Sequence, residues 1–573
     1  MCAHCCIYLC IQLLHASDIK SLNESGKSIS YDEVIEFYKQ LDAKYKTAKL
    51  FTEGLTDVGR PLHLFVISSD QIFDPKLARE NGKIIILVNN GIHPGEPDGI
   101  DASARLAEEY LTGGKVIPVN TILCIIPVYN IDGSLKRGCC SRANQDGPEE
   151  YGFRGNARNL DLNRDFIKCD SENAKSFTKI FQKWDPDVFV DTHVSNGSDY
   201  QYTLTLISTQ HNKLGGAVGE YLKKEMTPAL FSMMKLKGVE MAPYVNTSKY
   251  DESPESGIYG FMEGPRFATG YAALFSSLGF VTETHMLKPF VKRVEATITF
   301  LEVIVDYSSK NSEQIRQARK LSKEAVKTQK DFPLNWTVDS TKFEIIPFKG
   351  FEAKYRTSKV TGLDQLYYDR SQPYTRDVKF FDIYTPTLSA KKPDFYIVPQ
   401  AWKEVLERMQ INDVEMERLD KDTVIEVETY IITDFKSVTT PYEGHYLHNS
   451  VTCTTETKKV PYHKGDYKIM VNQECNRYIV ETLEPNAPDS WFAWGFFDAI
   501  LQQKEWFSGY VFEPVAEKML EENDSLRTEF ENKKTTDKEF AGSSFAQLYF
   551  IFKHSKYFED FKRYPVGRGF ITP

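Results

Sequence analysis

"KIIILVNNGIHPGEPDGIDASARLAEEYLTGG", residues 83–114, runs from an apolar segment through a polar turn into a helical pattern. The segment "IIILV" is apolar at every position, which is typical of a strand buried on both faces of a sheet. Beyond the turn, Pro97 stands near the start of a helix that paired glycines end. A strand that leads into a helix in this way is typical of α/β folds. The turn between them places His93 and Glu96 at the carboxyl end of a buried strand.

Other segments of the first half repeat this alternation. Strands are predicted for 62–69, 121–130, 187–194 and 279–286, and helices for 29–48, 213–230 and 293–310. Helices that separate strands usually connect parallel neighbours in one sheet. We therefore expect an α/β domain over about 20–310, built on a mixed, mostly parallel sheet flanked by helices.

The second half has a different pattern of predicted secondary structure. A charged helix is predicted for 311–332, followed by short alternating strands such as 342–355, 424–435 and 466–473. The segment 401–411 has helical periodicity, and an aromatic-rich helical tail begins at about 490. The predicted organisation is a first domain over 18–312, a connecting helix over 313–334, and a β-rich accessory domain over 335–573.

Composition limits the class of protein. The chain has 573 residues, too many for one core of ordinary size, and 41% of them are hydrophobic. Its net charge is −10, with acidic and basic residues interleaved, so nucleic acid is not an expected partner. No apolar run of about 18 residues follows the first twenty, so no membrane-spanning helix is predicted for the mature chain.

The N-terminal segment "MCAHCCIYLCIQLLHASD" is apolar and has small residues near Ala16, where a signal peptidase could cut. We interpret residues 1–17 as an export signal, which implies a secreted or periplasmic protein, with a lipid-modified cysteine as a variant of this reading. The segment lacks the basic residues that usually open such a signal, so a frayed terminus is the alternative. For the adjacent Cys139 and Cys140 we expect neither a zinc site nor a disulfide.

Four polar residues follow predicted strands. His93 and Glu96 follow "IIILV", His193 ends "DVFVDTH" and Glu283 ends "GFVTE". In open α/β sheets, ligands bind beyond the carboxyl ends of the strands, so these side chains are expected at one edge. Two imidazoles and a carboxylate form the His₂Glu set of catalytic zinc sites. Taken singly, each residue also fits a solvated turn, a core histidine or a capped strand end.

Two further motifs make the pattern specific. The order of "HPGE" (93–96), "NIDG" (130–133), "FRGNARNLDLNRDF" (153–166), "DTH" (191–193) and "VTETH" (281–285) resembles the zinc metallocarboxypeptidase family of the A, B and D types. The motifs cover roughly 60–310, about half of the chain. The second half is similar to the trailing region of large bacterial members of the family, and this likeness carries no catalytic role.

The resemblance implies a role for each matched residue. The set comprises the zinc ligands His93, Glu96 and His193, Asp161 as the hydrogen-bond acceptor of the first zinc histidine, the carboxylate-binding pair Asn163 and Arg164, the oxyanion-stabilising Arg154, and the general base Glu283. The base would deprotonate a zinc-bound water and pass the proton to the leaving amine. A guanidinium that makes two parallel hydrogen bonds suits a substrate carboxylate. One Zn²⁺ ion is the implied cofactor.

Some assignments stay open at this point. Arg142 and Arg158 are alternatives to Arg154 for the oxyanion, and Tyr259 and Tyr271 straddle the position of the family's substrate-capping tyrosine. Arg266 could bind an acidic substrate group, although a structural salt bridge is the preferred reading.

The histidines outside the matched set receive no catalytic role. His285 is read as inert, and a second metal site at His445 and His448 is not expected.

The favoured function is a zinc carboxypeptidase that cleaves the C-terminal bond of peptides or of cell-wall stem peptides. One alternative is a zinc deacylase of N-acyl amino acids, whose substrates also carry a carboxylate. Another is a non-catalytic protein that binds peptide or glycan. The ligands and the base, which pseudoenzymes usually lose, are all present in this chain.

Overall fold

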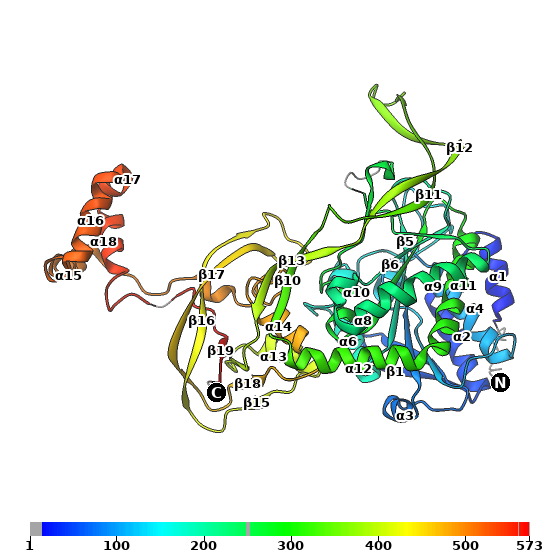
Figure 1. The fold of residues 1–573 in the computed structure, drawn as a ribbon, viewed down its shortest axis with the longest axis horizontal. Coiled ribbons are helices and arrows are strands. Elements are labelled where there is room, and N and C mark those ends of the chain that lie inside the picture. The colour runs from blue at the N-terminus through cyan, green and yellow to red at the C-terminus, as the bar shows by residue number, and fades with distance from the viewer. Residues whose placement is uncertain (1–13, 248–252, 560, 572–573) are drawn as a thin grey trace, which may run out of the picture.

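The structure, a computed structural model, describes residues 14–247, 253–559 and 561–571. An eight-stranded mixed sheet forms the centre of the first half, in the order β1-β2-β4-β3-β5-β9-β6-β7 (Figure 1). Its strands are β1 (Ala48–Leu55), β2 (Pro61–Ile67), β3 (Ile84–Asn89), β4 (Thr121–Ile126), β5 (Val188–Ser195), β6 (Leu204–Ser208), β7 (Met241–Pro243) and β9 (Leu278–His285). The adjacent strands β4, β3, β5 and β9 are parallel. The predicted fold class is confirmed.

Helices pack against the sheet in two groups. One group comprises α4 (Asp98–Thr112), α9 (Thr227–Leu236) and α11 (Phe290–Lys310), and the other α6 (Glu172–Trp184) and α10 (Ala268–Leu274). Side chains alternate between the faces of a strand, and β5 shows which group covers which face. The ring of Phe189 packs on Phe177 of α6, whereas Thr192 lies against Gly99 of α4. His193, an even number of residues from Phe189, therefore points to the face that α6 and α10 cover.

The second half contains three further sheets. A six-stranded sheet has the order β15-β18-β14-β19-β16-β17, a two-stranded sheet pairs β10 with β13, and a three-stranded sheet has the order β11-β12-β8. Their strands are β8 (Ile258–Tyr259), β10 (Asp331–Val338), β11 (Glu344–Thr357), β12 (Asp364–Phe381), β13 (Tyr384–Lys391), β14 (Phe395–Val398), β15 (Glu417–Arg418), β16 (Thr423–Ser437), β17 (His448–Tyr462), β18 (Tyr467–Met470) and β19 (Gly567–Gly569). All neighbours in these sheets are antiparallel except β12 and β8.

The remaining helices are distributed over both halves of the chain. They are α1 (Ala16–Glu24), α2 (Tyr31–Lys44), α3 (Pro75–Glu80), α5 (Ile131–Leu135), α7 (His211–Leu214), α8 (Gly216–Tyr221), α12 (Ser312–Thr328), α13 (Lys403–Ile411), α14 (Asn476–Leu483), α15 (Gly509–Glu522), α16 (Asp524–Thr536), α17 (Lys538–Ala541) and α18 (Ser544–Phe552). Helices α15–α18 enclose a small core of their own and project from the rest of the molecule (Figure 1). The predicted helix over 213–230 is interrupted, because Gly215 and Gly216 both adopt positive φ.

The two halves share one hydrophobic core. Phe275, which follows α10 of the first half, stacks on Tyr478 of α14 at 5.7 Å, and both belong to the main cluster of buried residues. Ion pairs cross the same boundary, such as Arg408 with Asp170 at 2.9 Å. The β-rich half is therefore packed directly on the segments of the first half that carry the sequence motifs.

Two expectations about the termini and cysteines have different outcomes. Most of the predicted signal segment, residues 1–13, lies outside the described residues, and the following ones lead into α1. The expectation for the cysteine pair is wrong, because Cys139 and Cys140 form a disulfide. Within the described part of the chain, no helix is both long and apolar enough to cross a bilayer.

A buried carboxyl group in α4 gives a prediction about stability. Asp101 is fully buried; its Oδ1 accepts hydrogen bonds from Asn23 Nδ2 at 2.7 Å and from the Ile29 amide at 3.2 Å. No described residue donates to Oδ2. Burial raises the pKa of this carboxyl to about 7, from its ordinary value of about 3.9.

Asp101→Asn should therefore stabilise the fold at neutral pH by about 1 kcal/mol or more, because the amide keeps an acceptor and cannot ionise. In the wild type, the contribution of this group to the free energy of unfolding falls as pH rises from about 4 to about 7, since only the unfolded chain ionises readily there. Urea unfolding of the wild type and the variant at pH 5 and pH 8 measures both the stabilisation by the substitution and the pH dependence of the wild type. A variant that is less stable than wild type at pH 8 would contradict this account.

Candidate metal centre

The turn after β3 brings its two polar side chains to one point. The Glu96 amide donates to the His93 carbonyl at 2.8 Å, which closes the turn. A Cβ atom at Gly95 would lie 2.6 Å from Cδ of Arg142, so the close approach of that arginine requires glycine. Gly95, between His93 and Glu96, thus leaves room for the side chain of Arg142 beside Glu96.

His93, Glu96 and His193 form the one group of potential metal ligands found among the described residues. All three side chains are buried, and one ligand atom from each lies within 4.8 Å of the others. Nδ1 of His93 lies 3.3 Å from Glu96 Oε1, and Nδ1 of His193 lies 3.1 Å from Glu96 Oε2. The sequence predicted these three as ligands, and the fold gathers them from the ends of β3 and β5.

Each imidazole also pairs through its Nε2 atom with a second carboxylate, besides that of Glu96. His93 Nε2 lies 2.9 Å from Asp161 Oδ1, and His193 Nε2 lies 2.8 Å from Asp191 Oδ2. Asp191 also accepts a hydrogen bond from Asn89 at 3.0 Å. Asp161 was predicted for this position, but Asp191 was missed. Its signal was present in the sequence, because residues two apart on a strand share a face.

The donor set fits Zn²⁺. Each histidine directs Nδ1 towards Glu96 and Nε2 towards a second carboxylate, the arrangement that orients zinc-bound imidazoles in proteins. Nδ1 of His93 is buried without a hydrogen bond from any described residue, so a metal would satisfy an atom that the protein leaves unpaired. These three residues therefore have the donor chemistry and the supporting carboxylates that a zinc site needs.

The field around this group keeps its acids ionised. Burial alone would raise the pKa of Glu96, but Arg142 and His93 hold it well below its ordinary range. Burial likewise opposes ionisation of Asp161, and His93 with Arg154 lowers its pKa in the same way. Asp191 outweighs the burial of His193 and raises the pKa of that imidazole.

Glu283 lies beside the metal ligands on the neighbouring strand. In the parallel pair of β5 and β9, its Cα is the partner of His193. The side chain is half-buried, and burial raises the pKa of its carboxyl to about 8; His193 lowers it, whereas the charge of Glu96 raises it further. A carboxyl with a raised pKa beside a metal site has the properties of a proton-transfer group.

Asn163 and Arg164 follow Asp161 in one short helical turn, Leu162–Arg164. The guanidinium of Arg164 lies on the ring of Phe267 at 4.2 Å, and Nη1 donates to the Asn163 carbonyl at 2.8 Å. Oδ1 of Asn163 accepts from the Ala268 amide at 3.4 Å. The Asp161 carboxylate also accepts from the Asn163 amide, so one turn links the residue that holds His93 to the predicted carboxylate-binding pair, Asn163 and Arg164, called the clamp below.

The three arginines considered for the oxyanion have different surroundings. Arg154 binds Asp161 through Nε at 2.9 Å and lies 3.6 Å from Glu96. Arg142 donates to Glu96 at 2.8 Å and to the Val194 carbonyl at 3.3 Å. Arg158 instead donates to the Asp170 carbonyl at 2.8 Å. Two of the three candidates thus reach the metal ligands.

The other residues singled out in the sequence lie in different environments. Tyr271 is buried, with its hydroxyl on Asn412 at 2.7 Å, whereas Tyr259 is half-buried and stacks on Phe381. Arg266 forms an ion pair with Asp489 at 2.8 Å.

Three histidines have partners outside the metal group. His285 is buried and lies 3.0 Å from the Ser198 carbonyl, and burial lowers its pKa to about 4. His445 pairs with Asp170 and His448 with Asp498.

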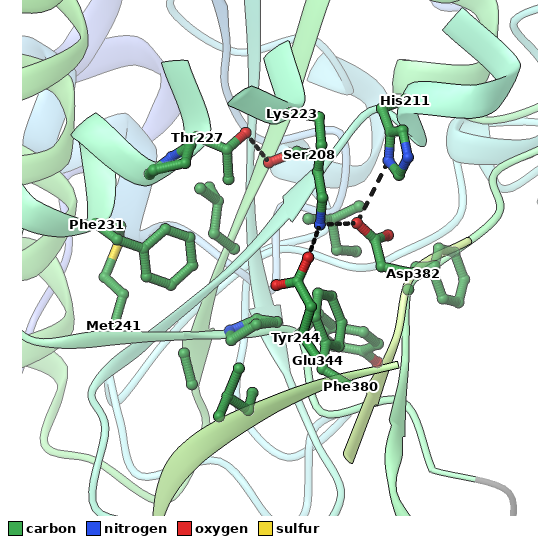
Figure 2. Close-up of a pocket in the computed structure, with 18 of the residues that line it drawn as sticks. Ser208, His211, Lys223, Thr227, Phe231, Met241, Tyr244, Glu344, Phe380 and Asp382 are labelled. Carbon is green, nitrogen blue, oxygen red and sulfur yellow. Dashed lines mark hydrogen bonds and ion pairs between the residues drawn. The ribbon is translucent and has the colours of Figure 1, made fainter. Parts of the chain in front are cut away.

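A separate cavity of about 490 Å³ lies at the edge of the central sheet, between β6, β7, α9 and the β11–β12 hairpin. Figure 2 shows its polar corner, where Lys223 lies between Glu344 and Asp382. Aromatic and aliphatic side chains such as Phe231 and Phe380 line much of the remainder, together with polar ones such as Glu240. None of the proposed site residues lines this cavity.

Comparison with known proteins gives a consistent result. Residues 34–212 match the sequence model of the zinc carboxypeptidase family. The chain is 22% identical over 495 residues to carboxypeptidase 2 of Trichophyton rubrum, covering 81% of this chain and 83% of the relative. It is also 22% identical over 453 residues to carboxypeptidase 2 of Trichophyton equinum, covering 72% and 74%. A metallo-carboxypeptidase structure from Burkholderia cenocepacia matches with a TM-score of 0.36 and 15% identity, over 49% of this chain and 70% of that one.

The fold and the motifs define a hydrolase of the metallopeptidase class, with a candidate metal site at the carboxyl edge of an α/β sheet. Within that class, residues 34–212 match the zinc carboxypeptidase family, and the relatives named above are carboxypeptidases. The curated relatives named above are fungal proteins.

Loss of one ligand should remove the metal. We expect His93→Ala to lower the zinc content from one ion per chain to near zero, because two ligands hold the ion far more weakly than three. Plasma emission spectrometry after dialysis measures the ratio, and circular dichroism checks the fold. His463→Ala, at a mostly exposed side chain in the second half, is the control. Full zinc occupancy in His93→Ala would exclude this ligand set.

Proposed function

We propose that this chain is a zinc-dependent carboxypeptidase that hydrolyses the last peptide bond of substrates with a free C-terminal carboxylate. The observation that supports it best is that one short segment both holds a proposed zinc ligand and carries the proposed carboxylate-binding pair. Asp161 holds His93, and Asn163 and Arg164 lie in the helical turn that Asp161 caps. A group that binds a terminal carboxylate beside a metal site positions the last peptide bond for attack.

Each proposed residue contributes a separate action. Zn²⁺, held by His93, Glu96 and His193, supplies Lewis-acid chemistry when bound and acidifies water. Arg164 and Asn163 hold the substrate carboxylate, since a guanidinium offers two parallel donors and the amide a third. Glu283 accepts the proton of the attacking water and returns it to the leaving amine, for which its raised pKa is suitable.

Arg154 is the proposed donor to the oxyanion that develops on the scissile carbonyl. The Arg154 side chain is 45% exposed, whereas that of Arg142 is 20% exposed and donates to Glu96. The more exposed arginine is better placed to meet a substrate, and the less exposed one to hold the Glu96 carboxylate. Donors of this kind stabilise the transition state more than the ground state.

Substrate class and location remain part of the proposal. Peptides and cell-wall stem peptides both present a terminal carboxylate to Arg164, and so do N-acyl amino acids. The N-terminal segment supports export, which would place the enzyme outside the cell or in the periplasm. Mass spectrometry of a library that contains linear peptides, γ-linked stem peptides and N-acyl amino acids separates these substrates. Release of a single C-terminal residue supports the proposal, and release of an acyl group alone supports a deacylase.

Glu283→Gln should lower kcat by about a thousandfold or more while zinc content stays at the wild-type level, because the amide cannot accept a proton. Hydrolysis of a short peptide, followed by chromatography, measures the rate. A variant that keeps wild-type kcat would exclude Glu283 as the base.

Arg164→Ala should raise KM for a peptide with a free carboxyl end about a hundredfold, since a charge-assisted pair contributes about 2–3 kcal/mol. The same peptide with an amidated C-terminus is the matched control, because it should be hydrolysed poorly by wild type and variant alike. Equal hydrolysis of the acid and the amide by wild type would remove the basis for a carboxylate clamp.

A further inference from the structure

A tight turn of the second half lies against the segment that carries the proposed clamp. Tyr442 and His445 exchange backbone hydrogen bonds of 2.7 and 3.0 Å across Glu443 and Gly444. The two central residues have φ values of 50° and 85°, as in a type I′ turn. Positive φ at glutamate is uncommon and costs free energy, so contacts with the rest of the protein must hold it.

Both ends of this turn, residues 442–445, are anchored on neighbouring segments. His445 Nε2 lies 2.7 Å from Asp170, which also pairs with Lys168 at 3.0 Å. At the other end, the ring of Tyr442 stacks on Trp494 at 6.1 Å. Arg266 lies over both of these rings and is fixed by Asp489. The position of Glu443 is therefore determined from two sides.

From this position, Glu443 reaches the backbone of the metal site. Its Oε2 accepts a hydrogen bond of 2.7 Å from the amide of Asp161. The side chain of the same aspartate binds His93 Nε2 and caps the turn that carries Asn163 and Arg164. One carboxylate from the second half thus fixes the residue on which a metal ligand and the clamp both depend.

We propose that Glu443 is a positioning residue of the substrate site, supplied by the β-rich second half. It acts through the Asp161 amide and contacts no metal ligand itself. The inference rests on the proposed carboxypeptidase function for its kinetic readout, but the hydrogen bond can be measured without activity. The β-rich half would then complete the site, beyond packing on the first half.

Two variants separate the hydrogen bond from the charge. Glu443→Ala removes the acceptor, and we expect kcat/KM to fall about tenfold to a hundredfold, the usual effect of a small misplacement of reacting groups. Glu443→Gln keeps an acceptor oxygen, so its kcat/KM should stay within about threefold of wild type, because a neutral acceptor is only moderately weaker. Tyr446→Ala, at the exposed residue after the turn, is the control and should behave as wild type.

Hydrogen–deuterium exchange of the segment 153–166 reads the bond directly in the zinc-loaded full chain. Protection should be lost in Glu443→Ala and kept in Glu443→Gln, with zinc content and melting temperature unchanged in both. The inference is overturned if Glu443→Ala keeps both kcat/KM and protection, or if Glu443→Gln loses as much as Glu443→Ala. If the wild type hydrolyses no peptide, the proposed function fails, whereas the exchange result still decides whether Glu443 orders this segment.

Discussion

A buried carboxylate shared by two imidazoles organises this molecule. The buried Glu96 carboxylate accepts hydrogen bonds from His193 and Arg142 and lies 3.3 Å from His93 Nδ1, and a buried charge is tolerated only when its partners are fixed. The parallel register of β3, β5 and β9 provides that fixation, because it brings strand ends far apart in sequence to one edge. The half-buried Glu283 and the turn of Asp161 are arranged around this carboxylate.

The second half contacts the segments that surround this carboxylate. Its helix α14 packs on α10, and its turn at 442–445 touches the segment between Asp161 and Asp170. Both contacts lie behind or beside residues of the proposed site. The shared core explains why a β-rich region without catalytic motifs is continuous with the catalytic one.

Sequence reasoning reached the sheet and the metal ligands for a physical reason. Strands buried on both faces have unbroken apolar runs, and the polar residues that end them stand out in the sequence. Asp191 was missed because it lies inside such a run, where its alternation with His193 was the only signal. Glu443 was missed because its contact with Asp161 joins residues 282 positions apart. Within the predicted β-rich region, strands β12 and β17 were not located individually, since at least half of their side chains are exposed and show no apolar alternation.

The central claim is that one metal site and one carboxylate clamp act on the same substrate. Its most direct test is a crystal structure with Zn²⁺ and a non-hydrolysable peptide that has a free C-terminus, with anomalous data collected at the zinc edge. The account predicts one zinc peak between His93, Glu96 and His193, with the peptide carboxylate on Arg164 and its last amide next to Glu283. A zinc peak elsewhere, or a peptide whose carboxylate points away from Arg164, would contradict it.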